Sequence, residues 1–351
     1  MINTLSSKPS DLVILLCLAI MMGSCTTVPQ ASEVPTTARP VPRKHLNHRD
    51  IRERAIEQVI ASLASQDPFI RANAVETSQY LPDRVGHMVQ LALEDKSEAV
   101  RFAAAAIIGK QRLKDLVRPV RRLLNDPSMS VYASALFALR RCGDPVDISP
   151  MAQLMQQPDA TLRGNVAMLL GLLEEPSAIP ILKNGSKWLG DYQISDAQAS
   201  LIRLQIAEAM VILGDESGLE AIRAMAYSTN DEVRILAVQA LGRVRDRKFE
   251  PALHSILNHN PIELRLAAAG SLAQLGDSAG LKILLAGSRF SLDPVRSQAA
   301  VALGYIAHPV AVQARVDLLT DPSEQVRLSA AAAILQGGQL DSTKLAATEE
   351  H

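Results

Sequence analysis

Aromatic residues are scarce in this chain of 351 residues, since Phe, Trp and Tyr together make up only 3%. A core without aromatic rings must be filled by Ala, Leu, Ile and Val, which suit helices packed closely through small side chains. Neither sign of charge is in excess, because 36 basic residues stand against 37 acidic ones. A near-neutral chain lacks the long-range positive field on which nucleic-acid binding normally depends. We therefore expect a helical protein without a nucleic-acid partner.

Motifs that carry chemistry are also missing. The sequence contains no P-loop, no dinucleotide fingerprint and no Gly-x-Ser-x-Gly. The seven histidines include no pair three or four residues apart within a helical repeat, which is the spacing of a zinc-type pair. His45 and His48 are three apart but lie in a Pro-rich stretch. We expect no catalytic residue, no metal ligand and no cofactor.

Cysteine is limited to three residues, and two of them precede the repeats described below. Cys17 lies in an apolar run and Cys25 directly follows a Gly-Ser pair, so Cys142 alone belongs to the repeats. A single cysteine cannot form an internal disulfide bond. Cys142 occupies a position that is mostly aliphatic in the other repeats, so we expect a buried, unreactive thiol.

Long hydrophobic runs are absent except at the N-terminus. Leu12–Met22 is apolar but shorter than the roughly 20 residues that cross a bilayer, and it suits an export signal. With Gly23, Ser24 and Cys25 it resembles a bacterial lipoprotein signal. The resemblance implies removal of residues 1–24, lipidation of Cys25 and, from Thr26 after the cysteine, an outer-membrane, periplasmic location in a Gram-negative cell. An ordinary cleaved signal or an uncleaved anchor remains an alternative.

The stretch after the signal is rich in Pro, Thr and Ser and has no apolar period. Such a segment cannot bury enough surface to become ordered, so residues 25–48 are predicted to be an extended tether that carries the lipidated cysteine. Residues 49–338 form the repeat region described next. Residues 339–351 are predicted to be a C-terminal tail.

One pattern occurs nine times along the chain, most clearly in DEVRILAVQALGRVRD at 231–246. We align the copies on one position after an aliphatic residue, which is Arg in all but one copy, and call it the anchor. Successive anchors are about 31 residues apart, with one longer step. So regular a period indicates repeats that bury their apolar faces only against their neighbours. The anchors are Arg71, Arg101, Tyr132, Arg163, Arg203, Arg234, Arg265, Arg296 and Arg327.

Each repeat contains two helical stretches. The second begins at the aliphatic residue before the anchor, and the residue seven positions past the anchor shares its face. A turn precedes this helix, often with Asp or Asn before Pro, as at Asp67-Pro68. The Asp or Asn side chain can accept hydrogen bonds from the free backbone N–H groups at the start of the helix, and Pro fits the first turn. Gly143, Gly214 and Gly276 follow second helices and predict the left-handed residue that ends a helix.

The copy DPVRSQAAVALG at 293–304 resembles the short HEAT-like repeat of phycobilisome lyases and related proteins. The resemblance covers residues 49–338. It implies an all-α, right-handed α-solenoid of about nine stacked antiparallel helix pairs, with the second helices on the concave side. It also implies that the anchor arginines bond to turn Asp residues of neighbouring repeats as a structural ladder; anion binding is the alternative. The ladder residues are Arg71, Arg101, Arg163, Arg203, Arg234, Arg265, Arg296 and Arg327.

A partner surface is expected on the second helices, at positions five and nine past each anchor. These positions lie opposite the core face, and in repeats three to five they hold apolar residues. An apolar patch on an exposed groove marks a binding site more often than chance exposure does. Burial by the curvature of the array is the alternative. The candidate contact residues are Phe137, Arg141, Met168, Leu172 and Ile212.

The longer step between anchors lies after repeat four and contains the single tryptophan of the chain. Insertions in repeat proteins map to loops on one face, often the binding face. Trp188 and Tyr192 are candidate anchors for a partner, because aromatic residues dominate binding hot spots. Packing of Trp188 into the gap between repeats remains an alternative.

These observations favour a lipid-anchored, non-catalytic scaffold that binds protein partners through its groove. One alternative is an enzyme of the HEAT-like lyase or hydroxylase type. The iron-dependent deoxyhypusine hydroxylases, built from similar repeats, hold their metal with His-Glu pairs, and no histidine in this sequence is followed by Glu. The other alternative is an array that serves only to form a homo-oligomer, because Ala330–Ala333 in the last repeat leaves an apolar end that needs a cover.

Overall fold

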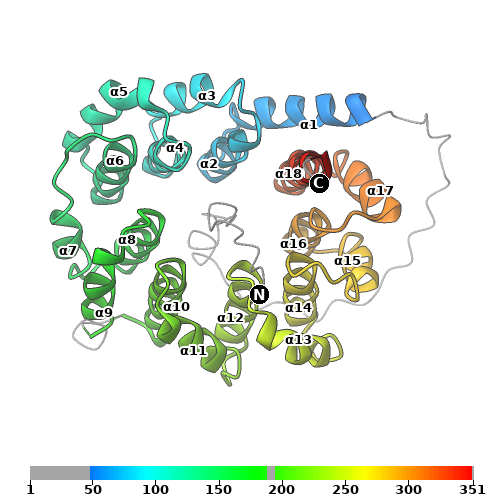
Figure 1. Ribbon diagram of the computed structural model, residues 1–351. Coiled ribbons are helices and arrows are strands. Elements are labelled where there is room, and N and C mark those ends of the chain that lie inside the picture. The colour runs from blue at the N-terminus through cyan, green and yellow to red at the C-terminus, as the bar shows by residue number, and fades with distance from the viewer. Residues whose placement is uncertain (1–47, 188–193, 350–351) are drawn as a thin grey trace.

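The computed structural model describes residues 48–187 and 194–349, and the regular structure in these ranges is entirely helical. Eighteen α-helices there form nine consecutive pairs, with short 3-10 turns between some of them (Figure 1). The expected all-α solenoid of helix pairs is confirmed. None of the helices in the described ranges combines the length and hydropathy that a membrane crossing requires. The predicted signal, Cys25, the tether up to residue 47, Trp188 and Tyr192 lie outside the described residues.

The helix bounds follow the repeat. The first helices are α1 (His48–Ser62), α3 (Val85–Ala92), α5 (Val117–Arg122), α7 (Pro150–Leu154), α9 (Ile179–Lys187), α11 (Glu216–Met225), α13 (Glu250–Ile256), α15 (Leu281–Gly287) and α17 (Pro309–Leu318). The second helices are α2 (Pro68–Thr77), α4 (Glu98–Gln111), α6 (Met129–Arg141), α8 (Ala160–Leu172), α10 (Asp196–Ile212), α12 (Asp231–Arg243), α14 (Ile262–Gln274), α16 (Asp293–Leu303) and α18 (Glu324–Glu349).

Local sequence signals set the helix ends. The Asp67 side chain accepts a hydrogen bond from the Phe69 N–H at 2.8 Å, directly before Pro68 in the first turn of α2. Gly143, Gly214 and Gly276 follow α6, α10 and α14 with φ angles of 90°, 86° and 89°. Only glycine adopts this left-handed conformation without strain, so these three positions end their helices as the sequence predicts.

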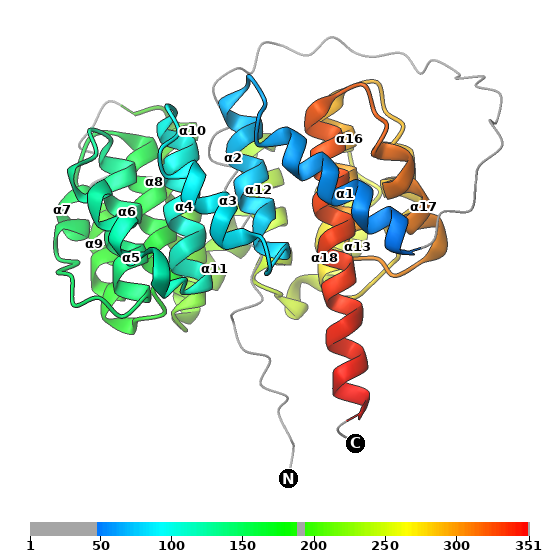
Figure 2. The same cartoon turned by 90° about the horizontal axis from the view of Figure 1, so that it is seen from above.

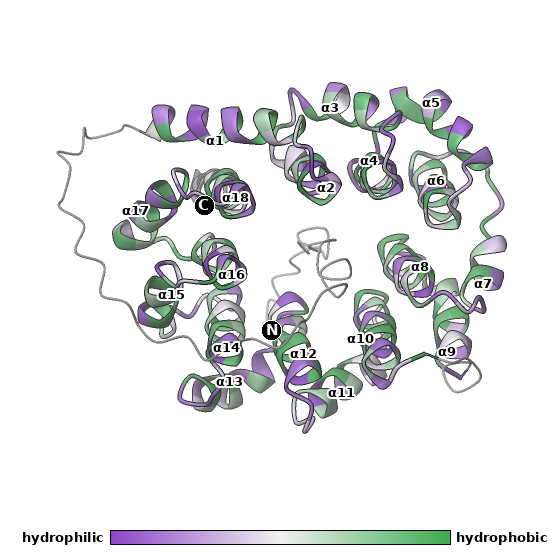
Figure 3. Ribbon diagram, turned by 180° about the vertical axis from the view of Figure 1, so that it is seen from behind, coloured by the Kyte–Doolittle hydropathy of each residue, from purple (hydrophilic) through white to green (hydrophobic). Residues whose placement is uncertain are grey.

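The second helices line the inside of the array and the first helices its outside (Figure 1). Figure 3 shows hydrophilic and hydrophobic residues on every labelled helix, as expected for helices that bury one face. Small residues let the second helices approach closely. A Cβ atom added to Gly109 would lie 2.5 Å from Phe137 Cε1 and 2.8 Å from Ala138 Cα. Cys142 is buried within the same core cluster.

The two ends of the array meet, so the molecule is a closed ring rather than an open solenoid (Figures 1 and 2). Ile56 and Val59 of α1 share a buried cluster with Leu328 and Leu335 of α18. Polar contacts reinforce the closure: Ser65 bonds to Glu324 at 3.0 Å, Asn73 to Gln325 at 3.2 Å, and Arg327 to Gln58 at 3.2 Å.

Ring closure corrects one premise of the sequence analysis. The apolar end expected to need a partner subunit is covered by α1 of the same chain. The helix that forms this end, α18, also continues beyond residue 338 to Glu349, through most of the segment predicted as a separate tail.

Candidate functional site

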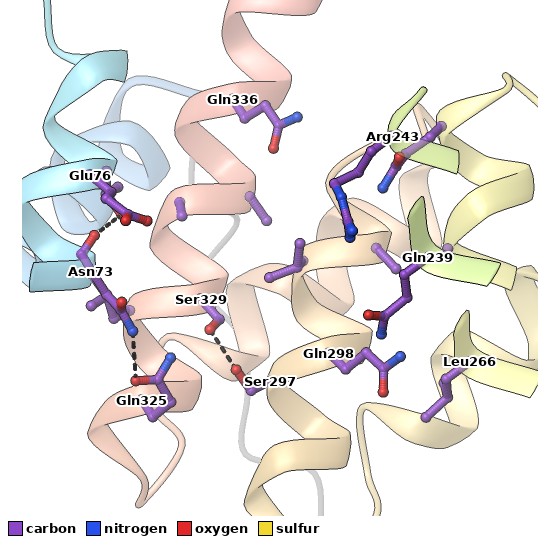
Figure 4. Close-up of a pocket in the computed structure, with 18 of the residues that line it drawn as sticks. Asn73, Glu76, Gln239, Arg243, Leu266, Ser297, Gln298, Gln325, Ser329 and Gln336 are labelled. Atoms are coloured by element: carbon purple, nitrogen blue, oxygen red, sulfur yellow. Dashed lines mark hydrogen bonds between the residues drawn. The ribbon is translucent and has the colours of Figure 1, made fainter. Parts of the chain in front are cut away.

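The inner side of the ring contains a pocket of about 290 Å³ (Figure 4). One wall is α2, from the start of the chain, and the facing walls are α12, α14, α16 and α18. Aliphatic and small residues such as Leu266, Val301 and Leu328 supply much of the lining, and a limited set of polar side chains points inward. This combination is typical of sites that hold small ligands.

The pocket follows the repeat pattern. Nine of its lining residues come from the two positions five and nine residues past the anchors, which are the positions expected on the concave side. These positions supply Glu76, Tyr80, Gln239, Arg243, Gly270, Gln274, Val301, Ala332 and Gln336. The residues belong to repeat one and repeats six to nine, whereas the sequence analysis placed the binding surface in repeats three to five.

Two buried amide atoms in the pocket have no hydrogen-bond partner. They are Gln239 Oε1 on α12 and Gln298 Nε2 on α16, and Figure 4 shows both side chains directed into the pocket. Other polar groups nearby are paired, since Asn73 Nδ2 donates to Gln325 Oε1 at 3.2 Å. A buried polar atom without a partner costs about 1–3 kcal/mol. One unpaired acceptor and one unpaired donor in the same pocket therefore indicate a place for a ligand.

Titratable groups gather at the α2 side of the pocket. Glu76 lines it and is only 6% exposed. Lys110 on α4 donates to Oε1 of the lining residue Gln79 at 2.7 Å. Burial lowers the pKa of the Lys110 amine to about 8, and the attraction of the Glu76 carboxylate opposes this change. A lysine with such a pKa is partly neutral near physiological pH and can accept a proton.

Two tyrosines and an arginine complete the polar part of the inner wall. Burial raises the pKa of Tyr80, and the nearby Tyr305 and Glu76 act in the same direction. Burial also raises the pKa of Tyr305, against a hydrogen bond with Gln336. Arg243 bonds to Glu208 through Nε at 2.8 Å, which links α12 to α10. The arginine is thereby held in place at the edge of the pocket.

The predicted partner residues do not form one exposed patch. Phe137 is 0% exposed because its ring packs against Gly109, so its assignment as a partner contact is wrong. Met168 and Leu172 are partly buried against the core, and Ile212 is also partly buried. Arg141 bonds to Glu174 at 2.9 Å. None of these five residues lines the central pocket.

The arginine column forms the expected contacts in part of the ring. Bidentate bonds at 2.7–2.9 Å join Arg71 to Asp95, Arg101 to Asp126 and Arg296 to Asp321 in the following repeat. Each arginine also donates to two carbonyl groups of the turn before its own helix. Each bonded aspartate also accepts a hydrogen bond from a backbone N–H of its own turn. The guanidinium group and the turn therefore hold each other in place.

The other anchor arginines differ from these three in their contacts. Arg163 is buried and donates to the Gly185 carbonyl at 2.8 Å. Arg234 pairs with Asp231 of its own helix, Arg203 is exposed and Arg265 is partly buried. Arg327 turns to Gln58 and closes the ring.

Potential metal ligands lie on the outer surface. Among the described residues, one cluster of three such side chains exists, formed by Glu250, His254 and Asp277. No pair of histidines marks this cluster in the sequence, and Asp277 is distant along the chain from the other two residues. The Glu250–His254 spacing of four residues on a predicted helix was the available signal.

A match to a known family now completes the description of the class. The sequence matches the family described as HEAT repeats over residues 85–170 and 219–291. The match and the nine stacked helix pairs agree with the resemblance drawn from the sequence. The chain contains HEAT repeats.

Similar curated proteins are enzymes. The deoxyhypusine hydroxylase of Bos taurus is 26% identical over 238 residues, which cover 59% of this chain and 76% of the bovine protein. The deoxyhypusine hydroxylase of Homo sapiens is 28% identical over 152 residues, covering 41% of this chain and 47% of the human protein. The chain thus spans about half the length of the human relative and three quarters of the bovine one.

Solved structures give a weaker likeness. Human deoxyhypusine hydroxylase in complex with glycerol aligns with a TM-score of 0.38 and 18% identity over 82% of this chain and 97% of that one. The complex of CpcE and CpcF of phycocyanin lyase from Nostoc sp. PCC7120 aligns with a TM-score of 0.34 and 17% identity over 88% and 100% of the two chains. Both TM-scores are low.

The relatives correct the functional interpretation drawn from the sequence. The absence of catalytic motifs led to a non-catalytic scaffold, but the curated relatives are named as hydroxylases, and this finding contradicts both the scaffold and the assignment as a non-enzyme. Residues that line the pocket, such as Glu76, Gln239 and Gln298, meet only in the folded ring, where no short sequence pattern records them.

Proposed function

We propose that this chain is an enzyme and that the central pocket is its substrate site. The similarity to hydroxylases supports the assignment to enzymes. The enclosed, largely aliphatic shape of the pocket supports its role as the site. The observation that carries this placement is the pair of buried, unpaired amide atoms, Gln239 Oε1 and Gln298 Nε2.

The two unpaired atoms support one class of substrate. Gln239 Oε1 needs a donor, and Gln298 Nε2 needs an acceptor. An amide group supplies both, with its N–H and its carbonyl oxygen. A peptide segment or a carboxamide therefore pairs both atoms and offsets the cost of their burial. The substrate is an amide-bearing molecule, such as a segment of another protein.

Proton transfer is assigned to a lysine at the α2 side of the pocket. Lys110 has a pKa of about 8 because of its burial, so a neutral amine is available to accept a proton. Glu76 lines the pocket and its charge acts on Lys110. A lysine with a lowered pKa beside a pocket is typical of active sites. Lys110, whose amine bonds to the pocket residue Gln79, is the proposed proton acceptor, and Glu76 in the pocket lining is its charged neighbour.

The iron site of the deoxyhypusine hydroxylases does not fit this chain. Those enzymes use His-Glu pairs, whereas His87, His254, His259 and His308 are exposed on first helices or in the turns beside them. The pocket lining presents carboxylate, phenol, guanidinium, amide and hydroxyl groups, and no imidazole among the described residues. The proposal therefore assigns no step to iron.

Substrate binding is tested with N-acetyl-lysine methylamide, which carries two amide groups and an amine. Titration calorimetry on the full chain is expected to show binding that falls at least about tenfold in a Gln239→Leu, Gln298→Leu double variant, since two hydrogen bonds are lost. Thermal denaturation checks that the variant still folds, as expected because Leu is close in size to Gln and one amide atom of each side chain has no protein partner. Gln90→Leu, an exposed change on α3, is the matched control. Equal binding by the double variant would remove the pocket from consideration.

Turnover is tested with two further probes. The first is the peptide fraction of a cell lysate, in which we expect mass changes that depend on Lys110 and disappear with Lys110→Met; no product from the wild-type chain would overturn the assignment as an enzyme. The second is a deoxyhypusine-containing peptide supplied with ferrous iron, oxygen and ascorbate. We expect no gain of an oxygen atom. A gain that requires iron would overturn the exclusion of the relatives' metal chemistry.

We also propose that the protein is exported and attached to a membrane through a lipid on Cys25. The lipoprotein-like signal Leu12–Cys25 supports this location. The Pro-rich stretch that follows the cysteine gives the ring reach from the membrane surface.

A further inference from the structure

Three side chains of repeat seven meet on the outer surface of the ring. Glu250 and His254 are four residues apart on α13, so they share one face of the helix. Asp277 follows the C-terminal end of α14. One potential ligand atom from each residue lies within 4.8 Å of the other two. His254 Nε2 is 2.8 Å from Asp277 Oδ2.

The same place in three other repeats holds an ordinary ion pair. A basic residue of the first helix pairs with the Asp that follows the second helix, as in Arg223 with Asp246, 23 residues apart. Arg121 pairs with Asp144 at the same separation. Lys183 pairs with Asp215 at 2.6 Å across the longer repeat five. His254 and Asp277 occupy the equivalent positions of repeat seven.

Repeat seven differs from these three repeats at two positions. Four residues before the basic residue, these three repeats carry Val117, Ile179 and Leu219, where repeat seven has Glu250. His254 stands in place of Arg or Lys. The two changes replace one cation facing one carboxylate with one imidazole facing two carboxylates. A neutral imidazole has a single N–H to donate, so it cannot balance both acids.

We propose that Glu250, His254 and Asp277 bind a divalent transition-metal ion, with Zn²⁺ as the preferred occupant. Imidazole nitrogen and carboxylate oxygen are ordinary zinc ligands at about 2.0–2.2 Å, and three protein ligands leave a fourth position for water. Partial exposure of the cluster gives that position access to solvent. The imidazole disfavours Ca²⁺ and Mg²⁺, which select oxygen ligands.

The bound metal performs the task that the ion pair performs in repeats three, five and six. It joins the first helix to the turn after the second helix, with two charges in place of one. The site lies on α13 and after α14, away from the inner face of the ring, and shares no residue with the pocket. It is independent of the proposed enzymatic activity.

Zinc titration of the full, tag-free chain after removal of metals by a chelator tests this site. Calorimetry is expected to give one Zn²⁺ per chain, and zinc should raise the melting temperature because it binds the folded state. His254→Arg restores the residue type of the other repeats and should fold with unchanged stability but lose zinc binding. Glu250→Leu restores the second column residue and should weaken binding at least about tenfold.

Two controls separate this site from other histidines. His259→Arg changes an exposed histidine just beyond α13 and should leave zinc binding intact. His48→Asn breaks the His45–His48 pair, which has a spacing of three residues, and should also leave it intact. Zinc binding that survives His254→Arg, that disappears with His48→Asn, or that is absent from the wild-type chain would overturn the proposal.

Discussion

Arg327 Nε donates a hydrogen bond to Gln58 Oε1 at 3.2 Å, and this contact joins the last repeat to the first. Arg71, Arg101 and Arg296 present the corresponding guanidinium edge to an Asp of the next repeat. No next repeat follows Arg327 within the described residues, so α1 supplies the acceptor instead. The array therefore covers its own end, which in open repeat arrays requires a polar cap.

The closure makes a first prediction about α1. Ile56 is 4% exposed within the cluster shared with α18, whereas Ile60 on the same helix is 43% exposed. Ile56→Ala should destabilise the closure by about 2–5 kcal/mol through the lost burial. Hydrogen exchange should then show reduced protection in α1, with the remaining repeats protected. Ile60→Ala is the matched control and should change stability by about 0.5 kcal/mol or less. Unchanged protection of α1 in Ile56→Ala would contradict this account of closure.

Two glycines in helices should respond in opposite directions to the same change. A Cβ at Gly109 meets the Phe137 ring and the Ala138 backbone at less than 3 Å, so Gly109→Ala should cost about 1–3 kcal/mol through overpacking. Gly86 on α3 has no atom within 4 Å of an added Cβ. Gly86→Ala should stabilise by about 1 kcal/mol, because Ala favours the helix. Chemical denaturation of both variants measures the difference, and stabilisation by both would contradict the close packing of α4 and α6.

The ladder predicts a loss of stability in acid. Although burial acts to raise the pKa of Asp126, the hydrogen bond from Arg101 and the Ser128 N–H lower it overall. Because the folded-state pKa is lowered, the full stabilisation is present above the ordinary carboxyl pKa of about 3.9. The stabilisation decreases as the pH falls toward the folded-state pKa, and it is lost below that pKa.

Asp126→Ala should remove this contribution and cost about 1–3 kcal/mol at neutral pH, since Arg101 loses its partner. Denaturation curves across the acidic range provide the measurement. Asp115→Ala, an exposed carboxylate beside α5, should have an acid profile like that of the wild type. Identical profiles for Asp126→Ala and the wild type would show that the Arg101–Asp126 pair contributes no stability.

The sequence predicts features whose residues are close together along the chain, and it does not predict those whose residues are far apart. The cap at Asp67 and the left-handed Gly143 are local, and the period placed the helix pairs within a few residues. The pocket depends instead on ring closure, which brings Asn73 within 3.2 Å of Gln325 across 252 positions of sequence. A periodic pattern fixes which face of a helix points inward, but not whether curvature closes the array. Phe137 failed as a surface residue because Gly109 in the preceding repeat lets its ring sink into the core.

The lipid anchor leads to a prediction about location. Cys25→Ser removes the thiol to which a lipid would be attached, and the protein should then leave the membrane fraction on cell lysis. Fractionation followed by mass spectrometry of the N-terminus provides the measurement. Cys17→Ser, in the apolar run of the signal, is the matched control and should leave the protein in the membrane fraction. Persistence of the Cys25→Ser protein in membranes would contradict lipidation.

Lys110 makes a prediction at alkaline pH. Its folded-state pKa of about 8 lies below the ordinary lysine value of about 10.4, so between these two values the unfolded chain binds a proton that the folded chain does not. Stability should therefore rise as the pH increases through this window, and the penalty for the buried charge should be constant below pH 8. Lys110→Met should be more stable than the wild type at pH 7 and should lack the rise.

The measurement is a series of denaturation curves from pH 7 to 10.5, together with NMR titration of reductively methylated lysines to observe the amine itself. Lys282→Met, an exposed change on α15, is the matched control and should retain the rise. Loss of the substrate-dependent product in Lys110→Met together with a gain in stability would show that the amine is kept for chemistry at a cost to the fold. A Lys110 resonance that titrates at the ordinary lysine value would contradict both its low pKa and its role as a proton acceptor.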